Sequence, residues 1–190
     1  MRTGSIALGL GLLLHLACSD SGAEPETQGC VRDSFATLDR ALRGETPPAT
    51  RQVRRALAEA ACREEVPPLL LAALAFQESR FDPRARGPAG GRGLLQVRPA
   101  TAEEIARLAG LAFSGADSLF EPRLNARLGA AYLRHLQEEF ESWEAVLSAY
   151  NLGPTRLRGM LRKGRRATSP YARKVQERWR SWEASVGGRP

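Results

Sequence analysis

The sequence predicts an all-α protein, and three observations support that prediction. Glycine and proline divide the chain into segments whose apolar residues recur at intervals of three and four, the period of an amphipathic helix. No segment shows the apolar–polar alternation of a half-buried strand. Of the 190 residues, 43% are hydrophobic and 26% are charged, a composition typical of a globular chain. This length suits one main domain with a small appendage.

The N-terminal half is expected to form four helices bounded by glycines and prolines. Gly44 and a pair of prolines separate the first two helices. Pro67 and Pro68 stand where the third can begin, and Pro99 where the fourth can, because proline is tolerated in a first turn. These features predict helices at about 33–43, 50–62, 69–79 and 99–109, with an irregular Gly- and Pro-rich loop over 81–98.

The C-terminal half continues the helical pattern. Leu124, Leu128, Tyr132, Leu136 and Phe140 recur every four residues and form one apolar side of a long helix. The patterns that follow predict a short helix over about 143–150, a restart at Gly153-Pro154 and a final helix from Ser169-Pro170 to about Glu183. The expected organisation is a main domain at 64–183, preceded by a tether and a small helical extension at 19–63 and followed by a tail at 184–190.

The N-terminus is similar to a secretory signal. Met1-Arg2 precede a short apolar stretch, Ile6 to Leu14, which is too short to span a membrane. Leu16-Ala17-Cys18 resembles the end of a bacterial lipobox, which would make 1–18 the signal peptide and leave Cys18 lipidated. His15 stands where that pattern has an aliphatic residue, so cleavage after Ala23 is the alternative. We favour the lipoprotein, because a cysteine directly follows the apolar stretch.

Cys30 and Cys62 remain once such a signal is removed. An even number of cysteines outside the cytoplasm indicates a disulfide. The bridge would close a loop of about 30 residues and stabilise the protein by about 3 kcal/mol. A buried free thiol at Cys62 is the alternative.

Glu78 is the candidate catalytic group. It lies near the end of the third expected helix, and Leu74 and Ala75 share its face. An apolar environment raises the pKa of a carboxyl, which suits a general acid. The alternative is a structural carboxylate that pairs with Arg80 or Arg84.

Four short motifs occur in order along the chain. They are Glu78-Ser79-Arg80-Phe81, Gly93-Leu94-Leu95-Gln96, Ala149-Tyr150-Asn151-Leu152-Gly153 and Pro170-Tyr171. In this order they resemble the soluble lytic transglycosylase domain family, whose fold is similar to goose lysozyme. Phe120-Glu121-Pro122, Asn125 and Gly129 to Leu133 are similar to the segment before the family's Tyr-Asn motif. The resemblance covers about residues 66–176.

The resemblance implies an enzyme that acts on peptidoglycan glycan strands, and the secretory signal indicates that it is exported to the periplasm or cell envelope. Such an enzyme cleaves the β-1,4 bond between N-acetylmuramic acid and N-acetylglucosamine and leaves a 1,6-anhydromuramic end without consuming water. Ordinary glycosidases need two carboxylates. The nearest second one, Asp82, precedes a proline and is expected to be a turn residue. A hydrolytic muramidase and a non-catalytic peptidoglycan-binding module on this fold are the alternatives.

Five further residues are assigned by the resemblance to substrate binding. Gln96 matches a polar contact to the substrate, although it could only brace its loop. Tyr150 and Asn151 match residues on the floor of the site, where core packing and a helix end are the alternatives. Tyr171 matches a tyrosine that reaches toward the catalytic glutamate, or it could simply pack. Ser79 is expected to orient the glutamate or to fix the helix end.

Three positions depart from the family pattern. Gly87 stands where serine is common, which removes one possible hydrogen bond to the substrate or to the glutamate. Leu95 replaces a methionine of similar volume. Arg98 replaces an apolar residue and could bind a substrate carboxylate or point to solvent.

The charge distribution and the absence of certain motifs argue against other classes of function. The net charge of +7 is densest between Pro154 and Arg180, where Glu177 is the only acidic residue. This run could hold an anionic glycan, a stem peptide or a lipid, or it could be a solvated helix face. A secretory signal and the lack of interleaved aromatic residues argue against nucleic acid. The two histidines, His15 and His135, form no metal motif, and no phosphate loop is present, so no metal or cofactor is expected.

Overall fold

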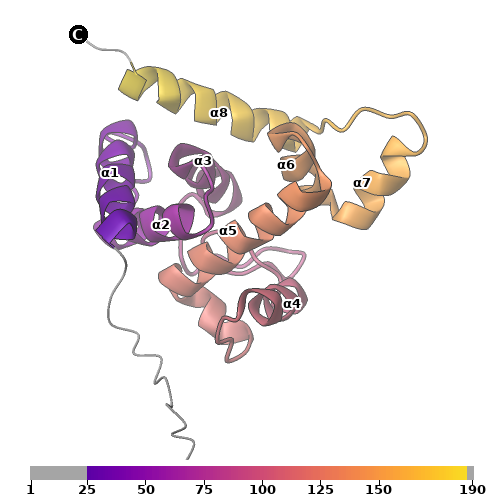
Figure 1. Ribbon diagram of the computed structural model, residues 1–190, viewed down its shortest axis with the longest axis horizontal. Helices are drawn as coiled ribbons and strands as arrows, with labels where there is room; N and C mark the ends of the chain where they lie inside the picture. The colour runs from indigo at the N-terminus through magenta and orange to yellow at the C-terminus, as the bar shows by residue number, and fades with distance from the viewer. Residues whose placement is uncertain (1–24, 188–190) are drawn as a thin grey trace, which may run out of the picture.

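The chain is all-α, as predicted. The computed structural model describes residues 25–187, and over that range no strand is present (Figure 1). The elements are α1 (Pro25–Ala41), α2 (Arg51–Arg63), α3 (Pro68–Ser79), α4 (Pro99–Ala109), the 3-10 helix η1 (Ala116–Phe120), α5 (Pro122–Glu139), α6 (Trp143–Leu152), α7 (Pro154–Leu161) and α8 (Pro170–Gly187).

Two helix boundaries differ from the expected ones. α1 begins at Pro25 rather than near residue 33, and α8 continues to Gly187 rather than ending near 183. The sequence argues against the early start because Gly29 lowers helix propensity there. Val31 and Phe35 pack against the core, and this tertiary contact outweighs the local propensity.

Capping groups fix where several helices begin. The Thr50 side chain accepts a hydrogen bond from the Val53 amide at 3.2 Å, and Ser142 caps α6 in the same way. Such caps contribute about 1 kcal/mol each. Proline occupies the first turn of α3, α4, α5 and α7, where its missing N–H costs no helical hydrogen bond.

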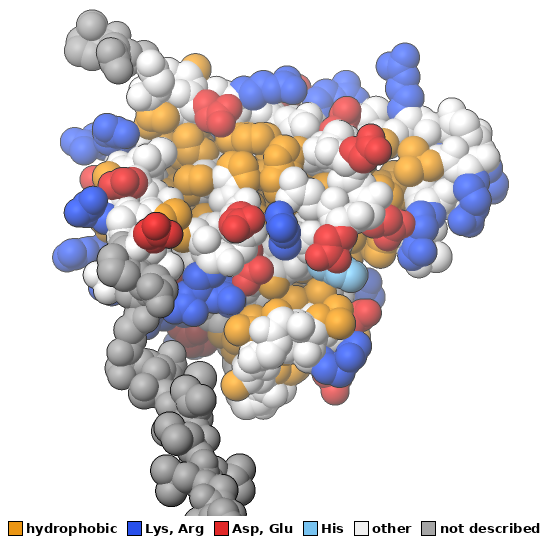
Figure 2. Space-filling view, viewed as in Figure 1, with side chains coloured by type: hydrophobic (Ala, Val, Ile, Leu, Met, Phe, Trp, Pro, Cys, Tyr) orange, Lys and Arg blue, Asp and Glu red, His pale blue; other side chains and the backbone are white. Residues whose placement is uncertain are grey.

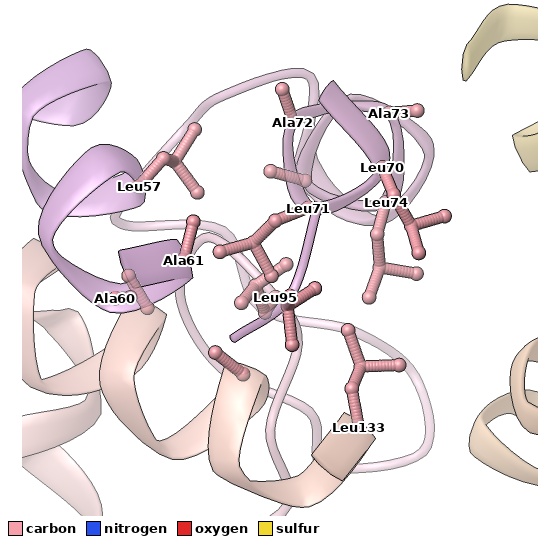
Figure 3. Close-up of a cluster of buried hydrophobic side chains, with 14 of the residues drawn as sticks. Leu57, Ala60, Ala61, Leu70, Leu71, Ala72, Ala73, Leu74, Leu95 and Leu133 are labelled. Carbon is pink, nitrogen blue, oxygen red and sulfur yellow. The ribbon is translucent and has the colours of Figure 1, made fainter. Parts of the chain in front are cut away.

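α3 forms the centre of the core. Its residues from Leu69 to Phe76 are all buried, and it packs against α1, α2 and α8. Figure 3 shows α2, α3, the loop before α4, and α5 contributing to one cluster of buried side chains. α2 therefore shares its core with the helices that follow it. Truncating one leucine of this cluster to alanine should cost about 2–5 kcal/mol.

A disulfide joins the first two helices. The sulfurs of Cys30 in α1 and Cys62 in α2 are 2.08 Å apart. The expected signal peptide and the lipidation candidate Cys18 lie outside the described residues. Within the described range, every helix is too short or too polar to cross a membrane.

Candidate active site

Glu78 lies one residue before the end of α3, where the chain turns sharply. Arg80 and Phe81 both have left-handed backbones, with φ of 54° and 65°. Side chains other than glycine adopt this region at a cost of about 1–3 kcal/mol, so packing must hold them there. Phe81 is buried, with its ring 5.4 Å from that of Phe76 and 6.4 Å from that of Trp182. This aromatic cluster fixes the position at which α3 ends.

The cations next to Glu78 in sequence do not pair with it. The Arg80 guanidinium lies over the Phe76 ring, 4.2 Å from its centre. Asp82, the other nearby carboxylate, is exposed and accepts a hydrogen bond from the Arg84 amide at 2.8 Å, as a turn residue does. Glu78 therefore keeps an environment without an ion pair among the described residues.

Asn125 of α5 holds the loop that follows α3. Its Oδ1 accepts from the Leu95 amide at 2.8 Å, and its Nδ2 donates to the carbonyls of Arg92 and Leu119 at 2.7 and 2.8 Å. Gly93 has a φ of 73°, and a Cβ there would overlap the Leu119 carbonyl and the Asn125 amide. Only glycine fits at this close approach, so the 93–96 segment has one position against α5.

Ser79 connects the end of α3 to the same loop. Its hydroxyl lies 2.8 Å from the Leu94 carbonyl and 3.1 Å from the Ala75 carbonyl, and both accept its one proton. The side chain is thus engaged with backbone groups, and it does not line the hollow beside Glu78. This arrangement fixes the helix end.

A hollow of about 330 Å³ opens beside Glu78. It lies between the end of α3, the loop before α4, α5 and α6. Four of the predicted site residues line it together, and Glu78 is the one carboxylate among its described lining residues. The predicted residues are Glu78, Gln96, Tyr150 and Asn151, and the others include Gly87, Arg98, Thr101 and Tyr132.

Tyr171 reaches Glu78 from α8. Its hydroxyl donates a hydrogen bond to Glu78 Oε1. Burial raises the pKa of Glu78 above the usual carboxyl value, while the Tyr171 hydrogen bond acts in the opposite direction. Burial and the nearby Glu78 carboxyl also raise the pKa of Tyr171 well above its usual value. Tyr171 therefore keeps its proton and remains a hydrogen-bond donor.

Tyr150 and Tyr132 form one wall of the hollow. The Tyr150 hydroxyl donates to the Leu95 carbonyl at 2.7 Å, and burial raises its pKa well above the usual value. The ring of Tyr132 lies 5.2 Å from the ring of Tyr150. The sequence placed Tyr132 only on the apolar side of a helix. Its place in the Gly129–Leu133 segment was the available signal that it belongs to the site.

Gln96 is held by the loop that carries it. Its Nε2 donates to the carbonyls of Gly93 and Ala85 at 2.8 and 3.2 Å. A Cβ at Gly87 would overlap Gln96 Oε1. The absence of a side chain at Gly87 therefore gives Gln96 its room, and a serine there would require Gln96 to move.

The basic run after α6 is mostly exposed. Arg158 pairs with Glu139 at 3.2 Å. The remaining cations of α7 and the turn after it make no ion pair with another described residue, and all are exposed. They are Arg156, Arg162, Lys163, Arg165 and Arg166.

Comparisons of this chain with family models and with known proteins agree on one family. Residues 55–171 match the family model described as the Transglycosylase SLT domain. The chain is 33% identical over 100 residues to the soluble lytic murein transglycosylase of Escherichia coli strain K12, covering 52% of this chain and 16% of that protein. It is 32% identical over 135 residues to the membrane-bound lytic murein transglycosylase F 2 of Alkalilimnicola ehrlichii, covering 67% of this chain and 27% of the relative.

A solved structure shows a shared fold. The 70-kDa soluble lytic transglycosylase of Escherichia coli superposes with a TM-score of 0.64 at 21% identity, over 88% of this chain and 32% of the other. This chain spans less than a third of the length of these relatives.

Proposed function

The chain belongs to the transglycosylase SLT domain family, and on that premise we propose that it is a peptidoglycan lytic transglycosylase. The substrate is the β-1,4 bond between N-acetylmuramic acid and N-acetylglucosamine. One observation carries the proposal: Glu78, a partly buried carboxyl with a raised pKa, is the one carboxyl among the described residues that line the hollow. Relatives named as lytic murein transglycosylases support it.

Glu78 acts first as the acid. Because burial raises its pKa, a protonated fraction persists toward neutral pH and can protonate the glycosidic oxygen. The bond from that oxygen to C1 of the muramic residue breaks, and the N-acetylglucosamine leaves with a free 4-hydroxyl. The carbonyl of the substrate's own N-acetyl group stabilises the positive charge at C1, so a second carboxylate is not required.

Glu78 then acts as the base. Its carboxylate takes the proton of the C6 hydroxyl while the C6 oxygen attacks C1 and closes the 1,6-anhydro ring. The proton lost in the first step is regained in the second, and no water is consumed. The Tyr171 hydrogen bond favours the carboxylate and burial favours the acid, so both states of Glu78 are accessible.

The other site residues position the substrate and the acid. We propose that Gln96 and Asn151 contact the sugars, since both line the hollow. Tyr150 holds the Leu95 carbonyl, and Ser79 joins the end of α3 to the loop. These two are positioning residues that keep Glu78 aimed into the hollow.

The envelope is the proposed location. Residues 1–18 act as a signal peptide in this proposal, and Cys18 carries a lipid that anchors the chain to a membrane. Residues 19–63 then form the tether and the two N-terminal helices, 64–183 the catalytic domain and 184–190 the tail. The family includes both soluble and membrane-bound relatives, in keeping with either an anchored or a released form.

Release of soluble fragments from purified peptidoglycan tests this function. The chain from Ser19 to Pro190 should release fragments, and Glu78→Gln should lower the rate at least about 100-fold while the protein still sediments with the wall. Glu59→Gln is the matched control, because it makes the same change at a carboxylate outside the hollow. Equal release by wild type and Glu78→Gln would refute the assignment. Wall binding by wild type without any release would favour the binding module.

A further inference from the structure

A second and larger hollow lies between α1, α2 and α5. Its volume is about 850 Å³, and arginines from all three helices line it. We call it the arginine groove, after Arg32, Arg51, Arg55, Arg63, Arg123 and Arg127. Glu59 is the one carboxylate among its described lining residues. At the left of Figure 2, over α1 and α2, basic side chains lie on the surface with acidic side chains among them.

The positive charge of the groove is only partly neutralised. Glu59 accepts hydrogen bonds from Arg123 at 2.8 Å and from Arg55 at 2.9 Å. Arg127 pairs with Glu64, and Arg32 pairs with Asp33. Arg51 and Arg63 are exposed and form no ion pair with another described residue. Two guanidinium groups at the rim are therefore available to an anionic ligand.

Between the arginines the groove is apolar. Val31 and Phe35 of α1, Ala56 of α2 and Leu124 of α5 lie among its lining residues. Guanidinium groups bind phosphate in a bidentate manner, and apolar side chains accept hydrocarbon, so this combination suits an amphiphile with an anionic head group. We propose that the arginine groove binds an anionic phospholipid surface and holds the protein against the membrane.

The N-terminal end of α1 lies beside the groove. α1 begins at Pro25, and its first turns supply Thr27 and Gln28 to the lining. Pro25 is seven residues after Cys18, a stretch that spans at most about 25 Å. A lipid at Cys18, as proposed above, would therefore bring this groove to the membrane first. The arginines of the groove would attract an anionic membrane with or without that anchor.

The catalytic hollow is on another side of the molecule. The two hollows share no lining residue. α5 contributes Arg123 and Arg127 to the groove and Tyr132 to the catalytic hollow. At 100° per residue, those arginines are turned about 180° and about 140° from Tyr132 around the helix. A membrane held at the groove would therefore leave the catalytic hollow open toward the cell wall.

Vesicle co-sedimentation tests the groove. The chain from Ser19 to Pro190 lacks the expected signal peptide and keeps every described residue. It should sediment with vesicles of phosphatidylglycerol and phosphatidylcholine, but not with phosphatidylcholine alone. Arg51→Glu/Arg63→Glu should weaken binding at least about tenfold. Arg165→Glu/Arg166→Glu, an equal change of charge in the basic run, is the matched control and should bind as wild type does.

Several results would overturn the proposal. These are no binding to anionic vesicles by wild type, an equal loss in both double variants, or a loss of peptidoglycan binding in place of vesicle binding in the groove variant. Thermal unfolding and fragment release check that each variant is folded, since neither arginine lies in the catalytic hollow. Arg51→Gln/Arg63→Gln gives a milder second test, with an expected loss of at least about threefold. Wild type without fragment release but with intact vesicle binding would refute the catalytic function alone.

Discussion

The catalytic hollow and the arginine groove shift the pKa of a glutamate in opposite directions. In the hollow, burial raises the pKa of Glu78, and a tyrosine is its hydrogen-bond donor. In the groove, burial also raises the pKa of Glu59, but hydrogen bonds from Arg123 and Arg55 and their charges outweigh burial and lower it. One carboxyl can therefore carry a proton where the other is held as an anion.

The difference arises from where the nearby arginines are directed. Arg80 and Arg178 lie on the Phe76 ring, 4.2 and 3.9 Å from its centre, and Arg178 also pairs with Glu45 at 3.6 Å. Neither arginine forms an ion pair with Glu78. Around Glu59 the arginines of α2 and α5 converge instead. The arginines near Glu78 thus have other partners, whereas those near Glu59 pair with it.

Removing the disulfide should cause a large loss of stability. Cys30→Ser/Cys62→Ser should lower the free energy of unfolding by about 3 kcal/mol, because it frees a long loop in the unfolded chain. The bond joins α1 to α2, two walls of the groove, and does not touch the catalytic hollow. Fragment release should therefore persist below the unfolding transition. Denaturant titration measures the loss, and a reductant should destabilise wild type but leave the double variant unchanged.

Restoring serine at position 87 should impair the catalytic hollow. The new Cβ overlaps Gln96 Oε1, so the Gln96 amide must shift from the position in which Nε2 donates to the Gly93 and Ala85 carbonyls. We expect Gly87→Ser to lower the rate of fragment release on the order of tenfold. Gln96→Ala provides the control: in that background, adding Gly87→Ser should have little further effect. Gly87→Ser with wild-type activity would show that Gln96 can move without cost.

Removing the carboxylate of Glu59 and removing that of Glu78 should change the stability of the protein in opposite directions. Glu59→Gln leaves Arg55 and Arg123 facing each other without their anion and should destabilise the protein by about 1 kcal/mol at neutral pH. Glu78→Gln removes a carboxyl that is costly to ionise when buried and should stabilise it. Thermal melting of both variants at one pH measures the contrast, and two changes of the same sign would contradict it.

The pH dependence of these two contributions should also be opposite. Glu59 has a lowered folded pKa, so its stabilisation is present above the ordinary carboxyl pKa and is lost as pH falls through the folded value. Glu78 has a raised folded pKa, so stability is lost as pH rises from the ordinary carboxyl pKa to the folded value. Differences in unfolding free energy between wild type and each glutamine variant, measured across pH, test both slopes.

Much of the fold was predictable because proline and glycine mark its helix boundaries. α3, α4, α7 and α8 all begin at prolines that the sequence predicts as helix starts. The start of α1 was not predictable, since contacts of Val31 and Phe35 with distant residues hold that turn. Local propensity carries no information about such contacts.

Part of the candidate site was predictable from the sequence, because four of its residues lie in short motifs. Glu78, Gln96, Tyr150 and Asn151 come together in one hollow as those motifs imply. The loop-holding role of Asn125 and the bond from Ser79 to Leu94 depend on how α3 and α5 pack, which no motif states. The arginine groove was missed for the same reason, because its charges are dispersed from residue 32 to 127 and the densest basic run lies elsewhere.

The mass of the soluble products tests the central claim most directly, that one carboxyl serves as both acid and base. Purified peptidoglycan is digested in oxygen-18 water by the chain from Ser19 to Pro190. We predict muropeptides that are one water lighter than hydrolytic products and lack the heavy oxygen, and we predict that Glu78→Gln releases none. Products that carry the added, labelled water would contradict it and make the protein a muramidase.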